Sequence, residues 1–278
     1  MKTNSRKEFL RMNICVCIKQ VPDTTEIKID PVKHTLIRDG VPSIVNPYDT
    51  YALENAARIK DAQPDTKIVV ISMGPEQAKN ALKECLSIAA DKAYLITDRK
   101  FGGSDTLATS YILSESIKYI EGIEGKFDAI FCGKQAIDGD TAQVGPEIAE
   151  HLDYPQVTYA LESFLEGDSL RVIQQGPEDK RVIGVKLPCV VTFTQAAFDV
   201  RYPNVRRRMA ANRAEIPGVT SVELSEIDLD RCGLKGSPTR VKSTFVPVHE
   251  NHLTMIKEDT IQESSRKLIE LLDNAHVI

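Results

Sequence analysis

The sequence has no apolar run that approaches the roughly 18 residues needed for a membrane-spanning helix, and no apolar signal-peptide segment follows its start. We therefore expect a cytoplasmic protein with no membrane span. An excess of basic residues is also absent, since 35 Lys and Arg stand against 40 Asp and Glu and give a net charge of −5. Because binding to nucleic-acid phosphates requires a basic face, this charge argues against nucleic-acid binding through the general surface.

The usual sequence signatures of catalysis and metal binding are missing as well. Neither G-x-G-x-x-G nor a P-loop motif is present, so no standard dinucleotide or P-loop site is indicated. The six cysteines are scattered, mostly inside apolar runs, and form no zinc pattern. No histidine is part of a readable triad, and the five are His34, His151, His249, His252 and His276. We predict no catalytic side chain and no metal site.

What the sequence does contain is an alternation of apolar runs and helix-period segments. With 42% apolar residues, the chain can bury a full core. The alternating segments are 14–18, 47–60, 67–73, 75–88, 93–96, 106–119, 127–133 and 141–152. This order indicates β-α units, and the continuous apolar strands indicate cover on both sides. We predict a Rossmann-like α/β fold with a mainly parallel sheet and helices on both faces.

The pattern changes after residue 155. Two β-rich runs flank residues 176–179, which predicts a β-hairpin insertion, and a further strand is expected at 190–194. Residues 198–246 show little periodicity, whereas 260–274 form an amphipathic helix. A long irregular segment of this kind is expected to wrap another surface. We predict a disordered extension at 1–11, a nucleotide-binding α/β domain at 12–197, and a partner-docking loop with an extended C-terminal arm at 198–278.

Ligands of parallel α/β sheets bind outside the carboxyl ends of the strands, so four loops are candidates. They are residues 19–24, 73–75, 102–109 and 133–145. Loop 133–145 is the most informative, because it precedes a helix expected to open near Thr141, whose free N–H groups favour phosphate. Glycines let its backbone approach a ligand, and its side chains offer hydrogen bonds. An empty helix capped by Asp140 or Thr141 explains the same spacing.

The turn at 102–109 follows the same physical logic. Its glycines deliver Asp105 or Thr106 as the N-cap of a helix, which serves either a phosphate or the helix alone. The turn is also similar to the SGGxD phosphate loop of ATP-pyrophosphatases, although that loop follows the first strand and this one follows the third. A stand-alone ATP-hydrolysing α/β enzyme is therefore a remote alternative.

A basic cluster follows residue 200, where arginines alternate with apolar side chains that are suited to a partner's pocket. The candidates for partner docking are Arg201, Tyr202, Val205, Arg206 and Met209, accompanied by Arg207, Arg208 and Arg213. A solvated charged loop would have the same composition.

Six motifs in order give the chain a resemblance to the electron-transfer flavoprotein beta subunit over about residues 12–275. They are CVCIKQ (15–20), VNPYD (45–49), SMGP (72–75), GKQAID (133–138), KLPCVV (186–191) and Arg201-Tyr202. VPDT (21–24) and GGSDTLAT (102–109) further resemble the flavin-bifurcating branch of that family. The arginine-rich segment around Val205 departs from the family's lysine-richer recognition loop, which leaves the partner's identity open.

The resemblance implies a heterodimer with an FAD-carrying alpha subunit. In ordinary members the beta subunit binds structural AMP. In the bifurcating branch a second FAD takes a hydride from NADH and divides the electrons between ferredoxin and the partner's flavin, with an acyl-CoA, enoyl-CoA or 2-hydroxyacid dehydrogenase downstream. The implied cofactor-binding residues are Cys17, Asp23, Asn46, Pro47, Tyr48, Asp49, Met73, Gly102, Asp105, Thr106, Thr109, Gly133, Gln135, Asp138, Gly139, Thr141, Gln143, Val144 and Gly145.

Overall fold

A computed structural model describes residues 12–23, 42–242 and 253–278. The chain forms two compact units, and the described residues up to Lys242 belong to the first while 253–278 belong to the second. The predicted extension at 1–11 lies outside the described residues, as does Thr24 of the first candidate loop. Within the described ranges, no helix is long and apolar enough to cross a membrane.

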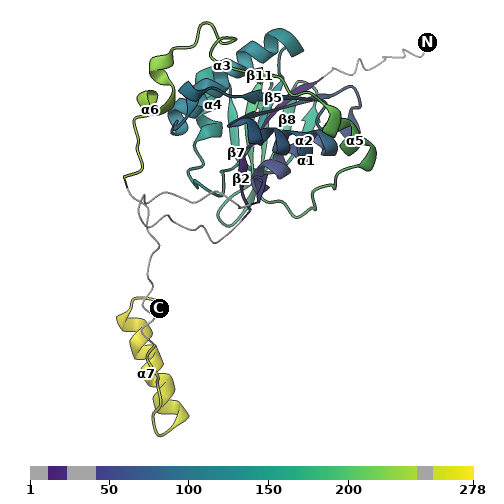
Figure 1. Cartoon of the computed structure of the whole chain (residues 1–278). Coiled ribbons are helices and arrows are strands. Elements are labelled where there is room, and N and C mark those ends of the chain that lie inside the picture. Colours follow the sequence, from purple (N-terminus) through teal and green to yellow (C-terminus); the bar gives the residue numbers. More distant parts are fainter. Residues whose placement is uncertain (1–11, 24–41, 243–252) are drawn as a thin grey trace, which may run out of the picture. The chain divides into compact units, whose positions relative to one another are not determined.

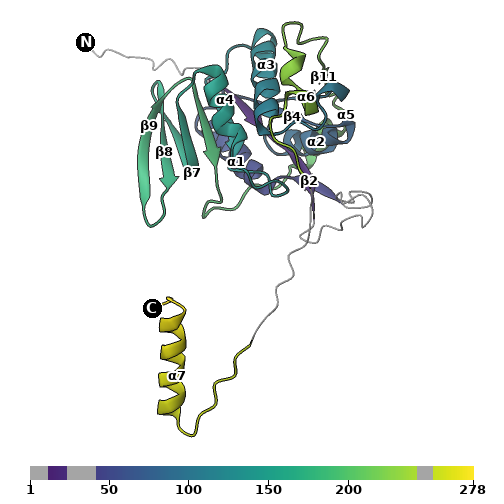
Figure 2. The same ribbon diagram turned by 90° about the vertical axis from the view of Figure 1, so that its left-hand side faces the viewer.

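A nine-stranded sheet forms the centre of the first unit (Figure 1). Its order is β11-β5-β4-β1-β6-β10-β7-β8-β9. The parallel strands are β1 (Asn13–Cys17), β4 (Lys67–Met73), β5 (Lys92–Ile96), β6 (Ala129–Gly133), β7 (Gln156–Glu166), β10 (Cys189–Phe193) and β11 (Gly218–Val219). Strands β8 (Ser169–Gln175) and β9 (Lys180–Lys186) continue antiparallel from β7 at one flank (Figure 2). A separate antiparallel pair joins β2 (Gln20–Pro22) and β3 (Ser43–Val45).

Side chains alternate along the central strands into two hydrophobic cores. In β1, Ile14 and Val16 pack beneath helices α1 (Pro47–Ala62) and α2 (Lys79–Ile88). Cys15 and Cys17 enter the opposite core with α3 (Thr106–Glu124) and α4 (Val144–Leu152). Period-two alternation therefore buries both faces, which confirms the predicted α/β fold with helices on both sides.

The connections between the strands define the point at which their direction along the sheet reverses. From β1 the chain passes through α1 to β4 and through α2 to β5, and it then crosses by α3 to β6 on the other side of β1. The loops after β1 and β6 consequently diverge, which makes this pair of strand ends the topological switch point. Short 3₁₀ helices η1 (Glu76–Ala78) and η2 (Arg99–Phe101) follow β4 and β5 at the same edge.

Two predicted elements agree with the structure. The hairpin is formed by β8 and β9. In the second unit, helix α7 (Ile261–Asn274) begins at a capping box, in which the Thr260 hydroxyl accepts from the Glu263 N–H while the Glu263 carboxylate accepts from the Thr260 N–H. The amphipathic period of the sequence identified this helix, and the structure adds its cap.

The irregular stretch after residue 198 contains more structure than its sequence indicates. It forms α5 (Val205–Arg213), the two-residue β11, the 3₁₀ helix η3 (Leu229–Arg231) and α6 (Gly233–Gly236). Helix α5 packs on α2 and buries Ala211 as its single fully buried residue. Because so little of α5 is apolar, periodicity has nothing to detect. The first unit continues to Lys242, beyond the predicted boundary at 197.

Helix α4 begins at Val144 and not near Thr141, which corrects the predicted start. The reason lies in the backbone, because Asp140 and Ala142 have φ of 53° and 54° in the left-handed region. Two such residues keep 140–143 out of the helix. The cap position is therefore Gln143, whose side chain makes no cap hydrogen bond.

Candidate functional site

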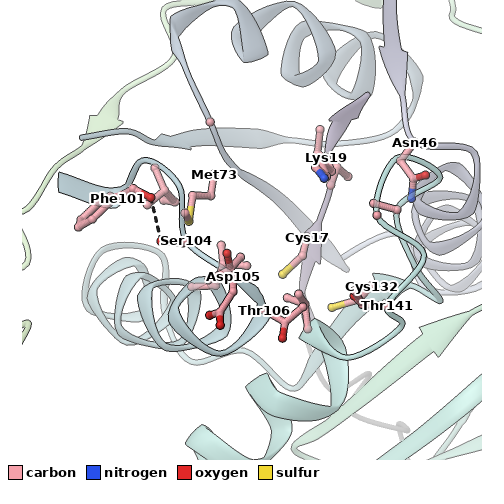
Figure 3. Close-up of a pocket in the computed structure, with 18 of the residues that line it drawn as sticks. Cys17, Lys19, Asn46, Met73, Phe101, Ser104, Asp105, Thr106, Cys132 and Thr141 are labelled. Atoms are coloured by element: carbon pink, nitrogen blue, oxygen red, sulfur yellow. Dashed lines mark hydrogen bonds between the residues drawn. The ribbon is translucent and has the colours of Figure 1, made fainter. Parts of the chain in front are cut away.

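A cavity of about 810 Å³ lies at the carboxyl ends of β1, β4, β5 and β6, at the switch point (Figure 3). Its walls come from residues 17–19, 73–76, 96–99, 101–106, 132–136 and 139–145, with Asn46, Asp49, Thr109 and Leu113 completing them. All four predicted regions beyond β1, β4, β5 and β6 therefore contribute to one space. Fold and sequence converge on this cavity as the candidate nucleotide site.

Most of the predicted cofactor-binding residues line the cavity. They are Cys17, Asn46, Asp49, Met73, Gly102, Asp105, Thr106, Thr109, Gly133, Gln135, Gly139, Thr141, Gln143, Val144 and Gly145. Four others do not. Pro47 is the first residue of α1, and Asp23 lies exposed beyond β2. Tyr48 turns its ring toward the Lys134 ammonium at 5.6 Å, and Asp138 pairs with Lys19 Nζ at 2.6 Å. A ligand role stays a prediction for these four and for the lining residues alike.

Asn46 and Asp49 hold two loops of the cavity in place through hydrogen bonds. The Asn46 amide donates to Asp49 Oδ1 at 2.9 Å and to the Gln135 carbonyl at 2.8 Å, and its oxygen accepts from the Ile137 N–H at 3.1 Å. Asp49 Oδ1 also accepts from the Gly133 N–H at 3.1 Å, and Oδ2 accepts from the Lys19 N–H at 2.6 Å. The hydrogen bonds of both side chains are thus made to the loops after β1 and β6. Their main effect is to fix the positions of these loops.

Asp49 is also an unusual carboxyl group. Burial raises its pKa to about 7, although the hydrogen bonds from Asn46, Lys19 and Gly133 lower it. The folded state consequently holds a proton that the unfolded chain releases near pH 4. Stability from this group is complete below about pH 4 and is lost as the pH rises through 7.

We expect the unfolding free energy of the wild type, relative to Asp49→Asn, to fall by about 2–3 kcal/mol between pH 5 and 8, at 1.36 kcal/mol for each pKa unit. Denaturant titrations of both proteins across this range measure the difference. A constant difference over the whole range would contradict the raised pKa.

The floor of the cavity is formed by two thiols. Cys17 and Cys132 are direct partners on the neighbouring strands β1 and β6, and both sulfur atoms lie on the side that faces Thr106 (Figure 3). The hydrogen bond with Cys17, together with burial, raises the pKa of Cys132 well above its usual value. The hydrogen bond with Cys132 lowers the pKa of Cys17. The hydrogen bond with Cys15 and burial raise this pKa by more, so the pKa of Cys17 is also well above its usual value. Both thiols are therefore neutral, and the floor presents no anion to a ligand.

One wall of the cavity is the N-terminus of α3. Asp105 is its N-cap and accepts from the Ala108 N–H through Oδ1 at 3.1 Å. Burial raises the pKa of Asp105, but the bonds that its carboxylate accepts from Ala108 and Thr239 outweigh burial and hold the pKa below its usual value. Asp105 is therefore an ionised cap whose acceptors are already used, and the positive end of the α3 dipole remains for a phosphate.

The adjoining wall is the N-terminus of α4. Gly145 lets this helix approach β10, because an added Cβ would lie 2.5 Å from Thr192 Cγ2. The next residue, Pro146, has no N–H, so Val144 and Gly145 supply the first-turn donors. The Thr106 hydroxyl lies 3.2 Å from Glu147 Oε1 and links the two helix starts. Two helix N-termini with unused donors can hold a diphosphate between them.

The structure adds residues that local sequence reasoning missed. Arg99 brings positive charge to the cavity, while Ile96, Phe101 and Leu113 bring apolar surface. Lys134, which lies inside the predicted loop 133–145, adds a second positive charge. The apolar run at 93–96 could have identified Ile96, because it is the last residue of a strand. Only the tertiary structure shows that Arg99, Phe101 and Leu113 reach the cavity.

The predicted docking residues divide into two groups. Arg201 forms ion pairs with Glu54 at 2.7 Å and Asp61 at 2.7 Å, and it also donates its backbone N–H to Glu54. Arg207 donates to the carbonyls of Leu86 and Ala90 at the end of α2. These arginines anchor α5 and the residues before it to helices α1 and α2. Tyr202, Val205 and Met209 are instead 92%, 77% and 56% exposed.

Replacing Arg201 tests this division. We expect Arg201→Ala to lower the unfolding free energy by about 2 kcal/mol, because buried Glu54 loses its bidentate guanidinium partner and keeps only the backbone N–H of residue 201 and Arg58 at 3.8 Å. Exposed Arg206 on α5 is the matched control, and Arg206→Ala should leave stability unchanged. Denaturant unfolding compares the two variants. Equal stabilities would contradict an anchoring role for Arg201.

Comparison with known proteins gives consistent similarities. Residues 33–224 match the electron transfer flavoprotein domain family. The chain is 49% identical over 257 residues to the electron transfer flavoprotein subunit beta of Megasphaera elsdenii, covering 91% of this chain and 94% of that protein. It is 45% identical to the caffeyl-CoA reductase-Etf complex subunit CarD of Acetobacterium woodii, covering 96% and 100%. It is 41% identical to Protein FixA of Sinorhizobium fredii, covering 91% and 89%.

Proposed function

Because this chain belongs to the electron transfer flavoprotein family, in which a beta subunit pairs with an alpha subunit to carry electrons, we propose that its cavity binds FAD and that the heterodimer bifurcates electrons from NADH. The acceptors in this proposal are ferredoxin and, through the alpha-subunit FAD, a flavin-dependent dehydrogenase. Family membership leaves the ATP-hydrolysing alternative without support.

The observation that carries the proposal is that the loop at 133–145 and the turn at 102–109 line one continuous cavity. AMP needs a single phosphate site beside an adenosine pocket. FAD is much larger, because it adds a second phosphate, a ribityl chain and a tricyclic ring. A cavity of about 810 Å³ that is lined by two helix N-termini accommodates the larger molecule.

The residues of the cavity also suit the chemical groups of FAD. The α3 and α4 N-termini, with Thr106, Val144 and Gly145, would hold the diphosphate. The neutral thiols of Cys17 and Cys132 give an uncharged surface for a flat ring system. When bound, FAD supplies the acceptor for a hydride and the donor of single electrons, and the protein's part is to bind, orient and shield it.

Counting nucleotides in the purified heterodimer tests the proposal. Mass spectrometry of released nucleotides is expected to find two FAD molecules for each heterodimer, and NADH is expected to bleach flavin absorbance. One FAD with one AMP, and no direct reduction by NADH, would establish the AMP-binding alternative.

A variant locates the second flavin within this chain. The double change Asp105→Ala and Thr106→Ala removes the cap and a hydroxyl from the cavity wall, so the heterodimer should keep one FAD and lose the other. Thr220→Ala, which alters a threonine of the turn after β11 outside the cavity lining, should keep both. Two FAD molecules in the double variant would place the second flavin elsewhere.

We propose that α7 docks on the alpha subunit. Its residues are largely exposed, yet Ile261, Leu268 and Ile269 form apolar surface on a capped and regular helix. We expect Leu268→Asp to weaken the heterodimer about tenfold, because the charge would be buried against the partner. The measurement is subunit affinity by titration, and Gln262→Asp on the same helix is the control. Equal affinity for wild type and Leu268→Asp would remove α7 from the interface.

The exposed apolar residues of α5 and of the segment before it support a dehydrogenase-docking role for Tyr202, Val205, Arg206 and Met209. The name of the Acetobacterium woodii relative supports a CoA-ester reductase as the class of partner. Arg201 contributes to this surface by holding its start in place.

A further inference from the structure

The N-cap of α3 is held by a segment far away in the sequence. Asp105 Oδ2 accepts from the Thr239 N–H at 3.0 Å and from the Thr239 hydroxyl at 2.8 Å. The Asp105 N–H in turn donates to the Ser237 hydroxyl at 2.9 Å. An N-cap carboxylate completes its local task with one bond to its own helix, here from Ala108. The bonds to Ser237 and Thr239 are additional to capping.

The same segment grips the turn that precedes α3. The Gly233 N–H donates to Ser104 Oγ at 3.0 Å, and Ser104 Oγ donates to the Phe101 carbonyl at 2.8 Å (Figure 3). The Ser237 hydroxyl donates to the Gly233 carbonyl at 2.7 Å and closes the network. Residues 233–239 therefore form a clamp around residues 101–105, which are part of the cavity wall.

Glycines make this close approach possible. Gly233 has φ of 60°, and an added Cβ would lie 2.3 Å from the Lys100 carbonyl oxygen. At Gly236 an added Cβ would lie 2.0 Å from the Arg231 carbonyl carbon. Only glycine permits this backbone to fold so tightly against the turn after β5.

We propose that Ser237 and Thr239 are positioning residues for the bound nucleotide. Ser237 fixes the Asp105 backbone and Thr239 fixes its carboxylate, and together they hold the α3 N-terminus at the geometry that phosphate binding needs. Thr239 does not line the cavity itself. It acts through Asp105, whose orientation sets the first turn of α3. The inference rests on the proposed nucleotide site and adds residues from outside it.

The chain offers a matched control for Thr239. In the turn after β11, the Thr220 N–H and hydroxyl donate to Glu223 Oε2 at 2.7 and 2.5 Å. This is the same chemical arrangement, a threonine giving two bonds to one carboxylate oxygen. Neither Thr220 nor Glu223 lines the cavity. Thr220→Val therefore removes an equivalent hydroxyl without touching the clamp.

The experiment measures the dissociation constants of FAD and of AMP for the purified heterodimer carrying each variant, after the bound nucleotide has been removed. Thr239→Val should weaken nucleotide binding about tenfold, because a hydrogen bond to a charged carboxylate is lost. Thr239→Ser keeps the hydroxyl and should restore wild-type affinity within about twofold. Ser237→Ala should weaken binding in the same direction, which keeps the test valid if Thr239→Val fails to fold.

Each outcome decides between named alternatives. Unchanged affinity in Thr239→Val and Ser237→Ala, while the wild type binds FAD, would overturn the positioning role and leave the proposed function standing. Equal weakening by Thr220→Val would also overturn it, because the effect would then be general. A wild type that prefers AMP, with the Thr239 effect present on AMP, would refute bifurcation and support positioning. A wild type that binds neither nucleotide would overturn both proposals.

Discussion

Gly133→Ala is expected to reduce nucleotide affinity by about a hundredfold while the sheet stays folded. An added Cβ at this position would lie 2.1 Å from Asp49 Oδ1 and 2.8 Å from both the Asp49 nitrogen and the Tyr48 carbonyl carbon. Two of these contacts are backbone atoms of α1, so no side-chain rotation relieves them. Overpacking of this kind costs about 1–3 kcal/mol, and the upper value corresponds to the stated loss.

The reason that affinity suffers is the position of Gly133 in the network. Its N–H donates to Asp49, which also receives the Lys19 N–H and the Asn46 amide. Displacing Asp49 therefore moves the loops after β1 and β6 together. Isothermal titration with FAD measures the affinity. Gly122→Ala, where an added Cβ meets nothing within 4 Å, is the control for the substitution itself. Wild-type affinity in Gly133→Ala would show that this glycine has no role in the site.

Val205→Asp is expected to slow electron transfer to the partner dehydrogenase about 30-fold and to leave the nucleotide content unchanged. Val205 is the first residue of α5 and is 77% exposed, whereas the anchoring arginines of this segment are tied to α1 and α2. Placing a carboxylate in a partner's apolar pocket costs about 2 kcal/mol or more, which corresponds to the expected factor. The folded subunit itself loses nothing, because Val205 packs into no core.

The rate of dehydrogenase-flavin reduction by the heterodimer, followed by stopped-flow absorbance, measures this effect. Val222→Asp is the matched control, since Val222 is 80% exposed in a turn outside α5. Both variants add the same charge to the surface, so long-range electrostatics are equal to a first approximation. Equal rates in the two variants would assign docking to a different surface.

Sequence periodicity gave most of the fold because each central strand is an unbroken apolar run and each covering helix has an apolar stripe. The strand 67–73 and the hairpin around 176–179 were predicted near their observed bounds for this reason. Helix α5 escaped detection, since it buries only Ala211 and is held by side-chain bonds from Arg201 and Arg207. Its stability comes from tertiary contacts that leave no period in the sequence.

The candidate site divides in the same way. Loops 102–109 and 133–145 were predictable, because glycines followed by a helix start at the end of a buried strand mark a phosphate-binding edge by local chemistry. The roles of individual side chains were not, because they depend on partners far away. Asn46 and Asp49 are predicted as ligand contacts from the sequence. In the structure their side chains form hydrogen bonds with the loops after β1 and β6.

The sequence by itself determined the α/β architecture, the edge of the sheet where the candidate site lies, and the amphipathic C-terminal helix, since each follows from the local pattern of residues. Only the tertiary structure decided which polar groups remain free to face a nucleotide. Asp105 shows why, because its carboxylate is used by Thr239 across 134 residues of chain. Hydrogen-bond capacity is finite, so a side chain's role depends on which partners the fold brings within 3 Å of it.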